Sequence, residues 1–116
     1  MALSELELAR VRKSMSSFIE QRRPPPHIRP KLDLGFRIDH QSVEIFEIRP
    51  VWKGKRGEMH EQPVAKATFV RTKDRWRVFW QRADLKWHSY EPAPEVASID
   101  DFLFLVRQDA YACFWG

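Results

Sequence analysis

The stretch PVAKATFVRTKDRWRVFWQR (residues 63–82) decides the fold. It contains two runs in which apolar and polar residues alternate, separated by the polar pair Lys73 and Asp74. Alternation with a period of two indicates strands that bury one face, and a short polar connection between two such runs indicates an antiparallel hairpin. The sequence therefore predicts a sheet with a hairpin at its centre.

The register of this hairpin predicts which side chains share a face. A two-residue turn at Lys73 and Asp74 would place Ala67 opposite Trp80 and Phe69 opposite Val78, so that small residues meet large ones. The core face would then carry Ala65, Ala67, Phe69, Trp76, Val78 and Trp80. The opposite face would show Lys66, Thr68, Val70, Arg75, Arg77, Phe79 and Gln81.

Two further strands are expected before the hairpin. KLDLGFRID (31–39) alternates strictly and indicates a half-buried strand. VEIFEIRPVW (43–52) is apolar on both faces, since Val43 and Ile45 point one way while Phe46 and Ile48 point the other. Such a strand is central or covered by a second layer.

A helix is expected on each side of these strands. Ser4 and Glu7 have the spacing of a capping box, and RRPPPHIRP (22–30) ends the first helix near Arg22 or Arg23. Its apolar stripe is Leu8, Val11, Met15, Phe18 and Ile19. Ser98 and Asp101 cap a second helix, whose stripe is Ile99, Phe102, Leu103 and Val106. The aromatic tail DAYACFWG (109–116) is expected to dock on the body.

The order of elements predicts a single α+β domain over residues 1–116, in which two helices pack on a four-stranded antiparallel meander. No apolar run approaches the roughly 20 residues that cross a bilayer, and the N-terminus lacks the pattern of a signal peptide. The single cysteine, Cys113, cannot form an internal disulfide and suits a reducing compartment. We therefore expect a cytoplasmic protein without membrane contact.

The charge map favours nucleic acid as a partner. The net charge is +4, but from Lys53 to Lys86 ten lysines and arginines face four acids, whereas one arginine faces five acids from Trp87 to the end. Cations contact phosphates, and an aromatic ring on a sheet can stack on a base. The residues expected to bind are Lys66, Arg75, Arg77, Phe79, Arg82 and Lys86, with Lys53, Lys55 and Arg56 in a nearby loop. The alternative is a solvated strand face that blocks edge-to-edge aggregation.

DLKWHSYEP (84–92) raises the possibility of catalysis. In an extended segment Arg82, Lys86, His88 and Tyr90 share one face, and a metal-independent ribonuclease needs such a set of cations and proton carriers. In this interpretation Trp87 points the other way and fills the core. The alternative is that Lys86 and His88 are merely solvated. No residue is assigned a catalytic role, and His88, Lys86 and Tyr90 stand as weak candidates.

No cofactor or metal is expected. The histidines and Cys113 are scattered without the spacing of a metal site. The glycines form no phosphate-binding loop. The aromatic neighbours of Cys113 indicate burial, which raises a thiol pKa and makes it inert.

Self-association or a protein partner is the second possible role. The two-sided apolar strand, together with Val70 and Phe79 on the outer face, could form a dimer interface. A helix covering that face is the alternative.

Several segments in combination resemble one bacterial family, catalogued as domain of unknown function 3024. They are RRPPPHIRPKLDLGFRIDHQSVEIFEIRPVW (22–52), QPVAKATFVRTKDRWRVFWQRADLKWHSYEPAP (62–94) and FLFLVRQDAYACFWG (102–116). The resemblance implies a small cytoplasmic bacterial protein and supplies no activity, cofactor or catalytic residue.

Taken together, the sequence predicts a non-catalytic binding module with nucleic acid as the leading partner. The second hypothesis is a homodimer or protein-interaction module, and the third is a ribonuclease-like enzyme. Phe79 or Tyr90 is expected to stack on a base. Four tryptophans are expected in the core: Trp76, Trp80, Trp87 and Trp115.

Overall fold

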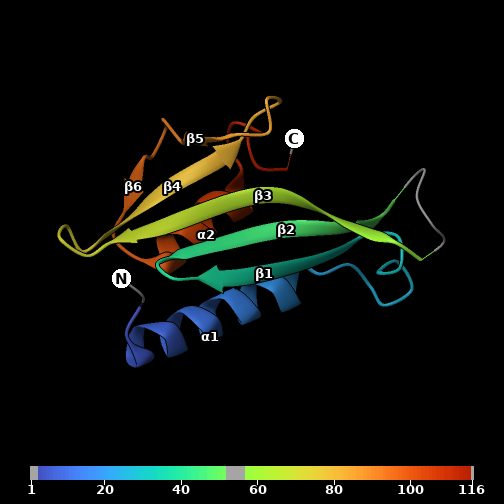
Figure 1. Cartoon of the computed structure of the whole chain (residues 1–116), viewed down its shortest axis with the longest axis horizontal. Coiled ribbons are helices and arrows are strands. Elements are labelled where there is room, and N and C mark those ends of the chain that lie inside the picture. Colours follow the sequence, from blue (N-terminus) through green and yellow to red (C-terminus); the bar gives the residue numbers. More distant parts are fainter. Residues whose placement is uncertain (1–2, 52–56, 116) are drawn as a thin grey trace.

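The computed structural model describes residues 3–51 and 57–115, in which one helix precedes and one helix follows the strands of an antiparallel sheet (Figure 1). In chain order the elements are α1 (Glu5–Arg22), β1 (Asp33–Asp39), β2 (Ser42–Pro50), β3 (Met59–Val70), β4 (Arg75–Gln81), β5 (Trp87–Ser89), β6 (Glu95–Val96) and α2 (Ile99–Gln108). The predicted α+β class is confirmed. Neither helix of this described part is both long and apolar enough to cross a membrane.

The described residues form six strands, whereas the sequence predicted four. The order β1-β2-β3-β4-β5 is a meander in which every neighbouring pair is antiparallel, and β6 pairs with β4 beside β5. Between β5 and β6 the chain is not a strand, but it stays hydrogen-bonded to β4. Tyr90 N–H donates to the Val78 carbonyl (2.9 Å), and Val78 N–H donates to the Pro94 carbonyl (3.0 Å). Strands of two or three residues are too short for alternation to reveal.

Both helices begin and end where the local signals place them. The capping box of α1 is present: Glu7 N–H donates to Ser4 Oγ (3.2 Å) and Ser4 N–H donates to Glu7 Oε1 (2.8 Å). The helix ends at Arg22, before the prolines. At α2, Asp101 N–H donates to Ser98 Oγ (3.1 Å). The predicted capping residues are therefore present at the start of both helices, and the prolines follow the end of α1.

The C-terminal tail docks on the body, as its aromatic content predicts. The Asp109 carboxylate accepts hydrogen bonds from the N–H groups of Phe114 and Trp115, both at 3.0 Å. Phe114 is buried against Tyr90, with ring centroids 4.8 Å apart. Trp115 lies half-buried and donates its Nε1–H to the Val106 carbonyl (2.9 Å).

The core lies between the helices and one face of the sheet. The sheet contributes alternate residues of β2, β3 and β4, and the helices contribute the stripes that the sequence predicts. The most completely buried side chains are Met15, Val43, Ile45, Val78, Tyr90, Phe102 and Val106. Trp76 belongs to this core, and Trp80 and Trp115 are partly buried against it.

The register of the central hairpin differs from the prediction by two residues. Ala65 pairs with Trp80 and Phe69 with Trp76, because the connection spans residues 71–74 rather than Lys73 and Asp74 alone. Asp74 adopts a positive φ of 50° at the end of this turn. A shift of two residues leaves every side chain on its predicted face, so the face assignment stands although the pairing was wrong.

β2 is central, as its two apolar faces predict. A β-bulge in β3 opposite Ile45 and Phe46 turns both Val64 and Ala65 into the core. Phe46 points to the other side of the sheet, which no helix of the described residues covers, and yet only 8% of its surface is exposed. Its ring lies beneath the Arg37 guanidinium, 4.6 Å from the ring centroid.

Candidate functional site

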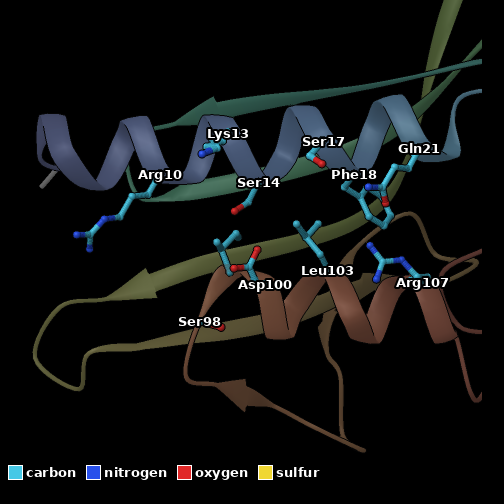
Figure 2. A pocket seen from close by; sticks show the side chains of 11 residues that line it. Arg10, Lys13, Ser14, Ser17, Phe18, Gln21, Ser98, Asp100, Leu103 and Arg107 are labelled. Carbon is cyan, nitrogen blue, oxygen red and sulfur yellow. The ribbon is translucent and has the colours of Figure 1, made fainter.

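The candidate site is the sheet face that points away from α1 and α2, here called the open face. Both helices pack on the opposite face and contact each other, as the close-up in Figure 2 shows. The ladder registers place five of its side chains on β3, β4 and β5: Lys66, Arg75, Arg77, Phe79 and Trp87. Successive side chains of a strand point to opposite faces, so these residues lie on one side of the sheet while Ala65, Trp76 and Val78 fill the core on the other.

Two aromatic rings and two cations on the open face contact one another, and we call them the aromatic–cation cluster: Lys66, Arg77, Phe79 and Trp87. Lys66 Nζ lies 5.7 Å from the ring centroid of Phe79 and 5.7 Å from that of Trp87. Arg77 Cζ lies 5.6 Å from the Phe79 centroid. These are cation–π distances, and they hold the two rings partly exposed under flexible charged side chains.

The cluster's cations form no salt bridge with any described residue, although Glu95, which binds Lys73, is the cross-strand neighbour of Arg77. Arg37 binds Glu44 (3.6 Å) and Glu61, and Lys73 binds Glu95 (3.1 Å). Among the salt bridges of the described residues, none involves Lys66, Arg75 or Arg77. Glu44 is the cross-strand partner of Lys66 but is held by Arg37. The positive charge of the open face therefore gathers on its β3–β5 half.

The predicted nucleic-acid residues divide into two groups. Lys66, Arg75, Arg77 and Phe79 share the open face. Arg82 and Lys86 do not join them. Arg82 Cζ lies 5.5 Å from the ring centroid of Trp80, a side chain of the helix-side face. Arg82 N–H donates to the Lys86 carbonyl (3.2 Å), which closes the turn between β4 and β5.

Trp87 was assigned to the core, and that assignment was wrong. Trp87 pairs with Gln81, and residues paired in a ladder share a face, so its ring lies on the open face beside Phe79. The length of the turn at residues 82–86 decides this, because one residue more or fewer would reverse the faces of β5. Trp87 is therefore the functional candidate that sequence reasoning missed.

The DLKWHSYEP stretch does not assemble the exposed proton-carrying face that its even positions predicted. Tyr90 is 2% exposed, and burial raises the pKa of its phenol, so it is available neither for stacking nor for proton transfer. Asp84 accepts a hydrogen bond from Lys86 N–H (2.9 Å) and lies 2.8 Å from His88 Nε2. These two contacts lower the pKa of the Asp84 carboxyl.

The remaining candidates are placed as follows. His88 pairs with Trp80 and lies on the helix-side face at the sheet edge, with a side chain that is 35% exposed. Lys86 is exposed in the turn. Cys113 is half-buried, and burial raises the pKa of its thiol. The loop cations Lys53, Lys55 and Arg56 lie outside the described residues.

Comparison with known proteins adds one finding. A family model described as domain of unknown function (DUF3024) matches residues 3–116. No curated protein and no solved structure matches the chain.

Proposed function

We propose that this chain, which belongs to the family described as domain of unknown function (DUF3024), binds single-stranded nucleic acid through the open face of its sheet. The observation that carries the proposal is the aromatic–cation cluster, in which Lys66 reaches two rings and neither cation forms a salt bridge within the described part of the chain. The proposal concerns binding without cleavage.

The chemistry of the cluster suits bases and phosphates together. Each nucleobase has a π-face that stacks on an aromatic side chain, and stacking contributes about 1–3 kcal/mol per base. Phe79 and Trp87 offer two such rings on neighbouring strands. Lys66 and Arg77 lie over them and can move from the rings to phosphate oxygens when a base takes the ring face, because their side chains are long and flexible. Arg75 lies further along β4 on the same face.

A single strand fits this face better than a duplex. The bases of a duplex are stacked on each other, so their faces are closed to side chains, whereas the bases of a single strand can be splayed onto a sheet. Neighbouring strands of a sheet are about 4.8 Å apart, so rings from β4 and β5 can hold bases that are close in the strand. The open face carries no helix that could enter a major groove, among the residues that the structure describes.

The proposal is tested by fluorescence anisotropy with a labelled RNA and a labelled DNA of about 12 nucleotides, a length within the range bound by single-strand proteins. We expect saturable binding to a single strand and weaker binding to the matching duplex. Lys66→Glu with Arg77→Glu should abolish binding. The matched control is Arg82→Glu with Lys86→Glu, which makes the same charge change in the turn between β4 and β5 and should keep most of the affinity.

Trp87→Ala separates stacking from charge, because it leaves every cation in place. We expect a loss of about tenfold to a hundredfold, which corresponds to the stacking energy of one base. Equal losses in both double variants would show a general charge effect and contradict the proposal, as would absence of binding by the wild type at low salt. A doubled mass in light scattering that Trp87→Ala halves would instead identify a second copy of the chain as the occupant of this face.

A further inference from the structure

A second concave surface lies on the other side of the molecule, between α1 and α2. It is a groove of about 710 Å³, which falls within the 300–1,000 Å³ typical of small-molecule sites. Figure 2 shows that the two helices run in the same direction, so that residues early in α1 face the start of α2. The groove is lined by residues of both helices, and the open face of the sheet contributes none of them.

The groove has two charged ends and a polar middle. Arg10 and Lys13 come from the part of α1 that lies at the same end of the groove as Ser98 and the start of α2. Ser14 and Ser17 follow along α1 with hydroxyl groups. Arg107 lies at the far end, where its guanidinium carbon is 5.8 Å from the ring centroid of Phe18.

The charges of this groove favour an anion. Three cations line it against a single carboxylate, Asp100. Among the described residues none of these four groups takes part in a salt bridge. The N-terminus of α2, an end that carries a partial positive charge, opens at the Arg10 end. Cations left without partners around a concave surface raise the local concentration of anions.

We propose that the groove between α1 and α2 binds a nucleoside polyphosphate. Its phosphates lie between Arg10, Lys13 and the start of α2, where charge-assisted hydrogen bonds are available. Its ribose hydroxyls face Ser14 and Ser17, which can donate and accept hydrogen bonds. Its base lies at the far end, where the planar guanidinium of Arg107 can stack on it.

The lengths agree with this arrangement. The α1 lining runs from Arg10 to Gln21, eleven residues apart, and a rise of 1.5 Å per residue makes it about 16 Å long along the helix axis. That span accommodates a ribose with a base at one side and a phosphate chain at the other. Asp100 opposes an anion at the phosphate end, so its removal should tighten binding.

The test is a calorimetric titration of the whole chain with ATP, adenosine and inorganic triphosphate. We expect saturable binding of ATP and no measurable binding of adenosine, which lacks the anion. Arg10→Glu with Lys13→Glu should weaken ATP at least tenfold, and because both residues are exposed on α1 the fold should survive. Arg107→Ala should weaken ATP more than inorganic triphosphate, since the triphosphate has no base to stack and loses only the attraction of one cation. Asp100→Asn should strengthen both.

The open-face variant Lys66→Glu with Arg77→Glu distinguishes the two surfaces, because neither residue lines the groove. Loss of ATP binding in this variant but not in Arg10→Glu with Lys13→Glu would overturn the groove and move the nucleotide to the sheet. Absence of saturable ATP binding by the wild type, or equal affinity for adenosine, would also overturn it. Oligonucleotide binding to the open face is measured in separate titrations, so the proposal for the open face and the proposal for the groove can fail independently.

Discussion

Phe46 lies directly across the β1–β2 ladder from Gly35, and its ring covers the glycine on the open face. A Cβ at position 35 would lie 2.8 Å from Phe46 Cε2 and 3.0 Å from Phe46 Cζ. The glycine is therefore required by the close approach of a ring. Together with Arg37, which lies on the other side of that ring, it explains how an aromatic residue is buried on a face that no helix of the described chain covers.

Gly35→Ala should destabilise the protein by about 1–2 kcal/mol, the lower part of the range for overpacking, because the ring tip can rotate away at the surface. The free energy of unfolding is measured by urea denaturation. Phe46→Leu removes the clashing atoms, so Gly35→Ala should cost less in that background. Equal cost in both backgrounds would show that the ring is not the obstacle.

Arg23→Lys should lower the free energy of unfolding, because the Arg23 guanidinium joins the end of α1 to β1 through two hydrogen bonds to Asp33. Its Nε and Nη2 atoms donate to the two carboxylate oxygens, each at 2.8 Å. A lysine keeps the charge but cannot make the paired contact. Arg12→Lys is the matched control on an exposed position of α1, and an equal loss there would contradict the interpretation.

The contact between Arg23 and Asp33 also predicts how the free energy of unfolding changes in acid. Hydrogen bonds from Arg23 hold the pKa of Asp33 below its ordinary value. A depressed carboxyl pKa contributes stability that is complete above the unfolded value of about 3.9 and is lost as pH falls through the lower folded value. The stability advantage of the wild type over Arg23→Met should therefore shrink below about pH 4. Urea midpoints measured from neutral to acidic pH check this, and an advantage that grows in acid would refute it.

Leu85→Asn should stabilise the protein by about 1 kcal/mol. Leu85 has a φ of 64° in the turn between β4 and β5, and its side chain is exposed. A left-handed conformation is costly for leucine, whereas asparagine adopts it readily. Leu6→Asn is the matched control, because Leu6 is also exposed but lies in α1, where asparagine is a poorer helix former. Thermal unfolding should show opposite shifts in the two variants.

Salt dependence separates the two groups of cations around β4. Each phosphate contact on a single strand contributes about 0.7 to the slope of log affinity against log salt. Lys66→Gln, Arg75→Gln and Arg77→Gln should each reduce the slope by about that amount, because these residues share the open face. Arg82→Gln and Lys86→Gln should leave it unchanged. The opposite pattern would place the nucleic acid at the turn between β4 and β5.

Local patterns in the sequence determined the elements and their faces. The capping residues Ser4 and Ser98 and the prolines after Arg23 set the helix boundaries. Alternation placed Lys66, Arg77 and Phe79 on one side of the sheet even though the predicted register was two residues off, because a shift of two preserves faces. These outcomes depend on neighbours close in the chain.

Tertiary structure alone decided which residues meet. The turn at residues 82–86 turned Trp87 to the open face and left Tyr90 in the core, and a change of one residue in its length would have exchanged the two faces. The bulge at Val64 and the short β5 and β6 depend on pairing with distant strands. The groove between α1 and α2 exists because two helices far apart in the chain pack side by side. Contacts of this kind are set by the packing of the whole domain, which no local period encodes.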